Sequence, residues 1–370
     1  MTSGRRGVGL TPMETRRDVI VRTALLAEEL GYEMFAVPEG WGLDSTPVLT
    51  EIALRTTRIR LASSVLSVWG RTPATLAMTA ATLHLVCDGR YVLGLGASTK
   101  ALVEGFHDIE FAHPAARLRD AVTTVRGLLG GQPAQLGQVP AAHRLRLGLP
   151  PAPAVPIWVA ALGQHTIRVA AELADGWIPA LAARDRLRGW AAELRQARDA
   201  AVPEARPLTV ATGPLTVVDE NADTARGVAA SCIAWYLCAM GDVYARSLSG
   251  QGYAAQVRAI IAANPRPSPS RGTIPGDAQD LLDQLAACGA RDQVRDQLQL
   301  WDQAADIVTI LLPPGLPWHN IEATLHAAAP SNQPERILSL SGSGHGPGHG
   351  NCAWGTVGAS RGRGLLRRPR

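Results

Sequence analysis

The feature that most constrains the fold of this chain is an alternation of short apolar segments with helical patterns, repeated about eight times. Because neighbouring parallel strands need a helical crossover between them, this alternation predicts a parallel sheet. Eight strand–helix units within residues 1–330 fit an α/β fold, the (β/α)8 TIM barrel. The predicted strands are residues 7–10, 33–37, 59–66, 91–96, 156–161, 176–180, 208–217 and 306–312.

Helix start and stop signals fall between these strands. Gly31 follows a helical repeat of apolar residues and is predicted to end the first helix. The stretches 44–47 and 72–73 each place a proline near a first helical turn, so both are predicted to begin helices. Further helices are predicted over residues 114–129, 166–174 and 184–200.

Two segments exceed what a barrel needs. Residues 131–154 form an excursion rich in proline and glycine, and residues 220–300 contain several helical patterns before the last strand. We expect the second segment to be a helical insertion that covers or packs beside the barrel mouth, with an oligomer interface as the alternative. Its aromatic and methionine residues are Trp235, Tyr236, Met240 and Tyr244.

The C-terminal tail, residues 331–370, is rich in glycine and arginine and lacks periodicity, so we expect it to be disordered. Residues 335–370 carry a charge of +5, and since the whole chain carries +4, the remainder carries −1. The body is therefore not predicted to bind nucleic acid, although the tail could bind RNA or an acidic surface weakly.

The chain shows no sign of a membrane or a secreted location. No apolar window approaches the length of a membrane span, and residues 1–10 lack the apolar region of a signal peptide, so we expect a cytoplasmic protein. The cysteines lack the spacing of a metal site or a disulfide framework. They are Cys87, Cys232, Cys238, Cys288 and Cys352.

Small residues, hydroxyls and one carboxylate follow four predicted strands where each strand ends. Active sites of barrels lie at the C-terminal ends of the strands, so we expect these stretches to converge. They suit a planar ring stacked against backbone, with an anionic tail at a glycine-rich turn. A phosphate fits Gly163 best, since the next helix presents free N–H groups and Thr166 adds a hydroxyl. The stretches are residues 38–41, 63–65, 94–98 and 160–166.

Each of these features also has a structural interpretation. Glu39 could face solvent, Trp41 could pack at the rim, and the glycines of "GLGAS" (94–98) could serve a tight turn instead of a cofactor. The segment after "GLGAS" shows no clean helix.

Other polar residues are expected to be structural. Asp175 is predicted to cap or to form an ion pair, and His107 and His113 are more typical of surface loops than of a barrel mouth. No metal-ligand spacing, nucleophile elbow or Ser/His/Asp order stands out.

Four stretches together resemble the bacterial luciferase-like family of flavin- and deazaflavin-dependent oxidoreductases. The resemblance spans about residues 7–330 and implies a TIM barrel with helical insertions, often as a homodimer. The stretches are "AEELGYEMFAVPEGW", "RIRLASSVLSVWGRTPATLAM", "GRYVLGLGAS" and "PIWVAALGQHTIRVAAELADGWI".

The resemblance also implies a site. It places a non-proline cis peptide at Ser64–Val65, bulging toward the ring of the cofactor, and an aromatic residue near the substrate at Trp41. Many members have an acid–histidine pair where this chain has Glu39–Gly40, so Glu39 is the proposed proton donor or acceptor, with a pKa that burial could raise. The implied cofactor-binding residues are Trp41, Ser64, Val65, Gly96, Ala97, Ser98, Ala161, Gly163, Gln164 and Thr166.

Three functions follow from the resemblance. The first is a reductase or dehydrogenase that uses the deazaflavin coenzyme F420 and passes a hydride to or from a small organic substrate. The second is an FMN-dependent monooxygenase, in which the ring meets dioxygen. The third is a non-catalytic cofactor-binding paralogue that has lost its proton relay at Gly40.

Overall fold

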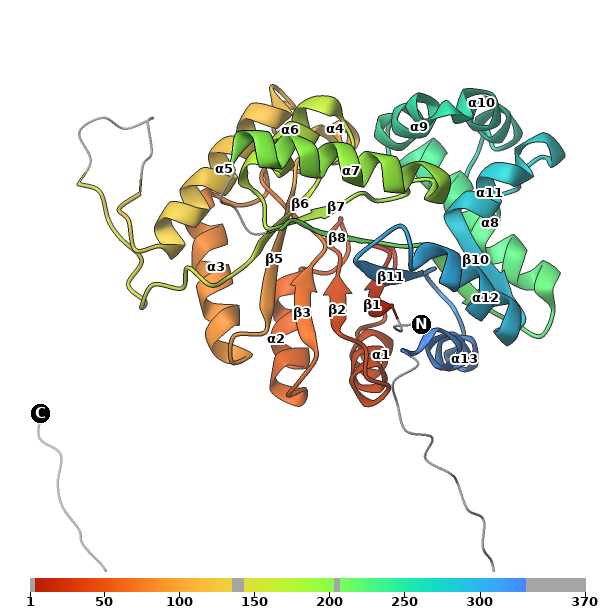
Figure 1. Cartoon of the computed structure of the whole chain (residues 1–370), viewed down its shortest axis with the longest axis horizontal. Coiled ribbons are helices and arrows are strands. Elements are labelled where there is room, and N and C mark those ends of the chain that lie inside the picture. Colours follow the sequence, from red (N-terminus) through yellow and green to blue (C-terminus); the bar gives the residue numbers. More distant parts are fainter. Residues whose placement is uncertain (1–3, 135–142, 203–206, 331–370) are drawn as a thin grey trace, which may run out of the picture. The chain divides into compact units, whose positions relative to one another are not determined.

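The strands of the computed structural model close into a parallel barrel, with helices around it (Figure 1). The structure describes residues 4–134, 143–202 and 207–330. β1 pairs in parallel with both β2 and β11, and this pairing closes the barrel. All eight predicted strands are confirmed in it. They are β1 (Arg5–Leu10), β2 (Met34–Val37), β3 (Arg60–Ser63), β5 (Tyr91–Gly96), β6 (Ile157–Ala160), β7 (Gly176–Ile178), β8 (Thr209–Thr212) and β11 (Ile307–Leu312).

The predicted helices around the barrel are present, and α4 and α13 add two that the sequence did not predict. Asp44 caps α2 by accepting a hydrogen bond from the Thr46 N–H, and Thr72 caps α3 by accepting one from Thr75. Gly31 follows α1 with a φ of 78°, a left-handed conformation that favours glycine. The helices are α1 (Arg17–Glu29), α2 (Ser45–Arg55), α3 (Pro73–Val86), α4 (Lys100–Gly105), α5 (Pro114–Leu129), α6 (Gln164–Leu173), α7 (Arg184–Ala201) and α13 (Trp318–Ala328).

The predicted helical insertion is present between the seventh predicted strand segment, residues 208–217, and β11, and it has an apolar core of its own. It also contains a short strand, β10 (Ala286–Gly289), which extends the sheet beside β9 (Leu215–Val218) and which the sequence pattern did not predict. The helical elements of the insertion are α8 (Ala222–Ala239), α9 (Val243–Leu248), η1 (Ser249–Tyr253), α10 (Ala254–Ala263), η2 (Gly276–Ala278), α11 (Gln279–Leu285) and α12 (Arg291–Trp301).

Three sequence expectations need correction. The predicted strand 208–217 is two strands, β8 and β9. The segment after "GLGAS" was expected to lack a helix, but residues Lys100–Gly105 form α4, which Thr99 caps by accepting a hydrogen bond from Leu102 N. The predicted strand 59–66 is two strands, because pairing breaks after β3 and resumes at β4 (Leu66–Ser67). Part of the predicted excursion 131–154 and the predicted tail 331–370 lie outside the described residues.

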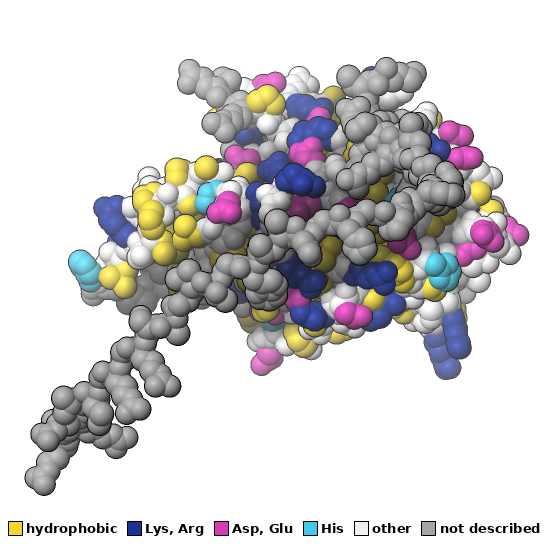
Figure 2. Space-filling view, turned by 90° about the horizontal axis from the view of Figure 1, so that it is seen from below, with side chains coloured by type: hydrophobic (Ala, Val, Ile, Leu, Met, Phe, Trp, Pro, Cys, Tyr) yellow, Lys and Arg dark blue, Asp and Glu magenta, His cyan; other side chains and the backbone are white. Residues whose placement is uncertain are grey.

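The interior of the barrel is filled by side chains. Trp158 is buried there among small and medium apolar residues such as Ala62 and Val92. Gly176 makes room for this tryptophan, since a Cβ on Gly176 would lie 2.6 Å from the indole ring. The face seen from below in Figure 1 carries interspersed basic and acidic side chains (Figure 2). Of the helices described, none is long and apolar enough to cross a membrane alone, although one bent pair, Ala222–Ala239 with Val243–Ala263, passes that test of length and composition.

Candidate active site

A cavity of about 1020 Å³ lies at the carboxyl ends of the barrel strands. Its wall brings together ten of the predicted site residues from four separate strand exits, as the barrel rule requires. These ten are Glu39, Ser64, Val65, Gly96, Ala97, Ser98, Ala161, Gly163, Gln164 and Thr166. Trp41 does not line the cavity. Its ring is 46% exposed and lies 5.9 Å from the ring of Trp235 in the insertion, in line with the alternative of rim packing.

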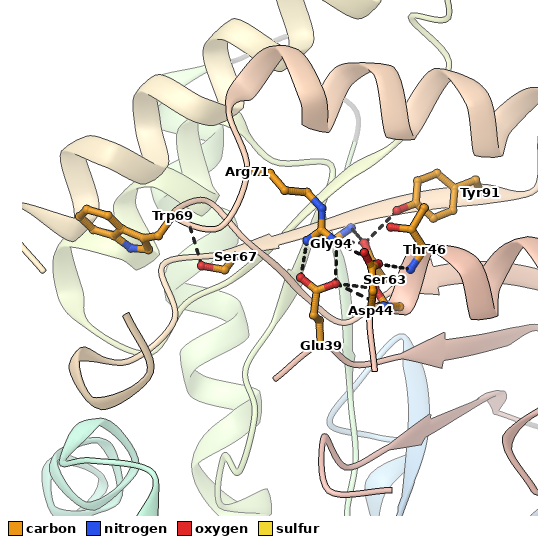
Figure 3. Close-up of polar contacts among 10 residues, drawn as sticks. Glu39, Asp44, Thr46, Ser63, Ser67, Trp69, Arg71, Tyr91 and Gly94 are labelled. Atoms are coloured by element: carbon orange, nitrogen blue, oxygen red, sulfur yellow. Dashed lines mark hydrogen bonds and ion pairs between the residues drawn. The ribbon is translucent and has the colours of Figure 1, made fainter. Parts of the chain in front are cut away.

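The strand break beside the cavity is a bulge, and the Ser64–Val65 peptide within it is cis, which confirms the sequence prediction. On either side of the bulge, Ala62 pairs with Val92 and Leu66 pairs with Leu95. Between these pairs, residues 63–65 lie opposite only residues 93–94 of β5. Ser63 Oγ replaces the missing ladder bonds. It accepts hydrogen bonds from Gly94 N at 2.9 Å and Tyr91 Oη at 3.0 Å, and it donates one to Gly94 O at 3.1 Å (Figure 3).

The glycines of β5 are required by this bulge. A Cβ on Gly94 would lie 2.0 Å from the carbonyl oxygen of Ser63, and a Cβ on Gly96 would lie 2.7 Å from the Val65 side chain. Both glycines belong to the strand itself, so the tight-turn interpretation does not apply to them. The chain turns after them, at Ser98, which has a φ of 60°.

Three non-glycine residues with left-handed backbone line the cavity. They are Ser98, His113 with a φ of 51°, and Leu181 with a φ of 53°. Such conformations are uncommon and cluster at ligand sites, where the surrounding structure holds them in place. His113 therefore reaches the mouth. His107, by contrast, packs close to Gly70 and does not line the cavity.

Glu39 is held by an arginine that the sequence did not single out. Both guanidinium nitrogens of Arg71 contact the carboxylate, with Nη2 at 2.9 Å from Oε2 and Nη1 on Oε1 (Figure 3). Ser45 donates to Oε2 through its N–H at 3.2 Å and its hydroxyl at 3.3 Å. The Glu39 side chain is only 14% exposed, so the solvent-facing interpretation is excluded, but the carboxylate is not free either.

Arg71 stands between two carboxylates. Its Nη2 also lies 2.9 Å from Asp44 Oδ1, at the N-terminus of α2. Hydrogen bonding to Glu39 raises the pKa of the Arg71 guanidinium above its ordinary value, in spite of burial, which lowers it. Arg71 lies one residue before the cap of α3, and no local sequence signal pairs it with Glu39.

The turn between β6 and α6 presents open backbone to the cavity. Gly163 is the N-cap of α6, and a Cβ placed on it would meet nothing closer than Thr166 Oγ1, at 3.7 Å. Thr166 Oγ1 donates to the Gly163 carbonyl at 2.9 Å. The first amides of a helix have no partner within it, so this turn suits an anionic group.

Other predictions are settled by contacts. Asp175 is structural, because its Oδ2 accepts hydrogen bonds from Arg126 and from Ile157 N, each at 2.8 Å. The insertion reaches the mouth, since Tyr236, Met240 and Tyr244 line the cavity. Among the residues with described positions, no group of three or more His, Cys, Asp or Glu side chains is placed to hold a metal ion.

A family model described as luciferase-like monooxygenase matches residues 1–306. The chain belongs to the luciferase-like monooxygenase family. This luciferase-like protein is 30% identical over 312 residues to a Mycobacterium tuberculosis protein named as a coenzyme F420-dependent oxidoreductase. The match covers 75% of this chain and 86% of the relative. It is also 31% identical over 153 residues to 5,10-methylenetetrahydromethanopterin reductase of Archaeoglobus fulgidus, across 41% of this chain and 46% of that protein. Family membership makes the chain an oxidoreductase.

Solved structures support the luciferase-like fold. An F420-dependent tetrahydromethanopterin reductase from Methanopyrus kandleri superposes with a TM-score of 0.70 at 18% identity, covering 89% of this chain and 98% of that chain. An F420-dependent secondary alcohol dehydrogenase gives 0.68 at 15% identity, with 88% and 98% covered. The FMN-bound oxygenating component of 3,6-diketocamphane monooxygenase from Pseudomonas putida gives 0.63 at 15% identity, with 89% and 99% covered. At these identities the likeness establishes the fold alone.

Proposed function

We propose that this chain is a coenzyme F420-dependent oxidoreductase that transfers a hydride between the deazaflavin and a small organic substrate. The observation that carries the proposal is the joint position of the Ser64–Val65 bulge and the open turn at Gly163 on one cavity. Relatives named as F420-dependent support it.

The residues present fit such a cofactor. Ser64 and Val65 would lie beneath the ring of the cofactor, and Gly96 and Ser98 would lie along the middle of the cofactor. The turn that begins at Gly163 would hold its phosphate. A Cβ at Gly163 would meet only Thr166 Oγ1, at the ordinary contact distance of 3.7 Å, so the backbone N–H groups of this turn stay open to a ligand. When bound, F420 supplies a two-electron carrier that gives or takes a hydride.

Glu39 is the proposed catalytic residue, and its contacts suggest how it acts. Among the described residues, Oε2 accepts hydrogen bonds from Arg71 and Ser45, whereas Oε1 accepts from Arg71 alone. A carboxylate oxygen can accept at least two hydrogen bonds, so Oε1 keeps a position for a donor in the cavity that Glu39 lines. Glu39 therefore acts as a fixed acceptor for the proton of a substrate O–H, and Arg71 holds the carboxylate in place.

The cofactor assignment is tested by titrating the purified full chain with F420 and with FMN. We expect F420 fluorescence to change on binding and FMN to bind weakly. Tight FMN binding with unchanged F420 fluorescence would instead favour an FMN-dependent monooxygenase, which the FMN-bound relative in fold makes the second candidate.

The catalytic assignment is tested with Glu39→Gln, which keeps the side-chain size. Turnover should fall by about 10²- to 10⁴-fold, the usual contribution of a positioned acid or base, while F420 affinity stays near that of the wild type. Unchanged turnover would mean that Glu39 is not catalytic. A chain that binds cofactor but turns over no substrate in either form would be a non-catalytic paralogue.

We also propose a cytoplasmic homodimer. α3 contains no Asp, Glu, Lys or Arg, and its exposed face carries Met78 and Leu85, each 57% exposed, beside Thr75 and Thr82. Leu54 on the neighbouring α2 is 74% exposed. Large apolar side chains exposed together without charges are normally covered, and a second copy of the chain would cover this face of α3. The free thiols of Cys87 and Cys232 agree with a reducing compartment.

A further inference from the structure

The insertion contributes a wall of the cavity that none of the roles above uses. Tyr236 from α8 and Tyr244 from α9 both line it. Their rings meet edge to face, with centroids 5.2 Å apart and planes at 83°. Tyr236 is only 6% exposed, so its orientation is fixed by packing.

Neither phenol hydroxyl forms a hydrogen bond with any residue that the structure describes, although buried polar groups almost always do. Neither hydroxyl oxygen is among the fully buried side-chain atoms that lack a partner, so each keeps contact with solvent, and both tyrosines line the cavity. Burial raises the pKa of Tyr244 to about 12 and raises the pKa of Tyr236 well above its ordinary value, so both hydroxyls keep their protons at neutral pH and can donate.

Among the residues with described positions, no charged side chain without an ion-pair partner lies beside the two tyrosines on this wall. Met240, Val243 and Leu181 are apolar neighbours on the same wall. Asp242 and Arg246 also line the cavity, but they form an ion pair with each other at 3.1 Å and are both highly exposed. A charged substrate would therefore find no fixed counter-ion on this side, whereas an uncharged oxygen would find two donors.

An aromatic chain ties this wall to the loop that carries Glu39. Trp41 packs on Trp235 at 5.9 Å, and Trp235 packs on Tyr236 at 5.5 Å. Trp41 lies two residues beyond Glu39 in the same loop after β2. The tyrosines and the carboxylate are thus positioned by one continuous set of contacts.

We propose that Tyr236 and Tyr244 form a subsite that binds the carbonyl or hydroxyl oxygen of a neutral substrate with an apolar skeleton. The inference deepens the proposed function, because it assigns the chemical class of the substrate for the same cavity. It explains why two aromatic side chains of the insertion keep unpaired hydroxyls beside an apolar surface.

The test compares ligands that differ only in the oxygen. Acetophenone and 2-acetonaphthone would be titrated by calorimetry into the full chain, with and without F420, beside the hydrocarbons ethylbenzene and 2-ethylnaphthalene. The wild type should bind each ketone more tightly than its hydrocarbon. Tyr236→Phe and Tyr244→Phe should each weaken ketone binding by about 2- to 10-fold, the usual effect of one hydrogen bond, and leave hydrocarbon binding unchanged.

Tyr253→Phe is the matched control, since Tyr253 is buried in the same insertion but does not line the cavity. It should leave both ligand classes unaffected. An equal loss of affinity for ketone and hydrocarbon in the Tyr236 and Tyr244 variants would overturn the proposal. It would also be overturned if none of the three variants changed the ketone affinity, or if the wild type bound neither ketone. Thermal unfolding of each variant separates loss of binding from loss of fold.

The two proposals fail in different ways. If F420 does not bind but the ketone preference depends on the tyrosines, the subsite stands and the cofactor assignment is wrong. If F420 binds and the tyrosine variants discriminate as the wild type does, the subsite is wrong and the cofactor assignment stands.

Discussion

At the scale of single residues, the barrel mouth depends on places where no side chain fits. Gly94→Ala would place a Cβ 2.0 Å from the carbonyl oxygen of Ser63, so the strand or the bulge must move. We expect a loss of about 1–3 kcal/mol or more in the free energy of unfolding, measured by urea denaturation. Gly227→Ala is the control, because Gly227 lies in the exposed interior of α8 with nothing within 4 Å of its Cβ, and should gain about 0.5–1 kcal/mol. Equal stabilities for both variants would contradict the account of the bulge.

A second prediction at this scale concerns Arg71. Arg71→Met should lower kcat strongly because Glu39 loses both guanidinium contacts, and Arg71→Lys should restore only part of it, since lysine cannot form the paired contact. Steady-state kinetics of Glu39→Gln combined with Arg71→Met should show no further loss beyond Glu39→Gln alone. Asp44→Asn, which removes the other carboxylate on Arg71 but keeps a capping side chain, should retain turnover. Additive losses in the double variant would mean that Arg71 acts independently of Glu39.

At the scale of elements, the sequence predicted the eight barrel strands because each is a distinct apolar run. It did not predict where a run breaks. The segment 208–217 is two strands, β8 and β9, because Gly213 packs so close to Thr309 that a Cβ would lie 2.4 Å from its carbonyl oxygen, and Pro214 has no N–H to donate. β10 escaped notice because its residues are small and follow α11 without a turn.

The candidate site, like the strands, could be predicted from the sequence only in part. Positions at strand ends were predictable, since the barrel rule alone brings ten of the predicted residues to one cavity. Partners distant in the chain were not, because local sequence carries no signal for them. Arg71 was missed for this reason, and Trp41 was assigned to the cofactor although its ring packs on Trp235.

One junction between elements predicts a response to pH. Burial acts to raise the pKa of Glu28 in α1, but the backbone N–H groups of residues 57–59, just before β3, donate to it and lower the pKa overall below its ordinary value of 4.5. A depressed pKa contributes stability at neutral pH that is lost as the pH falls below about 4.5. Glu28→Gln should therefore be less stable at pH 7, by about 0.5–1 kcal/mol because solvent screens the partly exposed carboxylate, and should lose less on acidification than the wild type. Parallel denaturation midpoints for the two proteins from pH 7 to pH 3 would refute this assignment.

At the scale of the whole molecule, the apolar surface of α3 makes the assembly testable. Leu85→Lys and Met78→Lys each place a charge where a second chain would pack, so light scattering should show a shift from dimer to monomer without loss of helical signal. Leu300→Lys is the matched control, because Leu300 is 54% exposed on α12, in the insertion. It should leave the dimer intact. A monomeric wild type, or dissociation caused by the Leu300 change alone, would show that α3 is not the interface. If the dimer does form through α3, the insertion with its tyrosine wall stays outside the contact made by α3, and each chain keeps its own cavity.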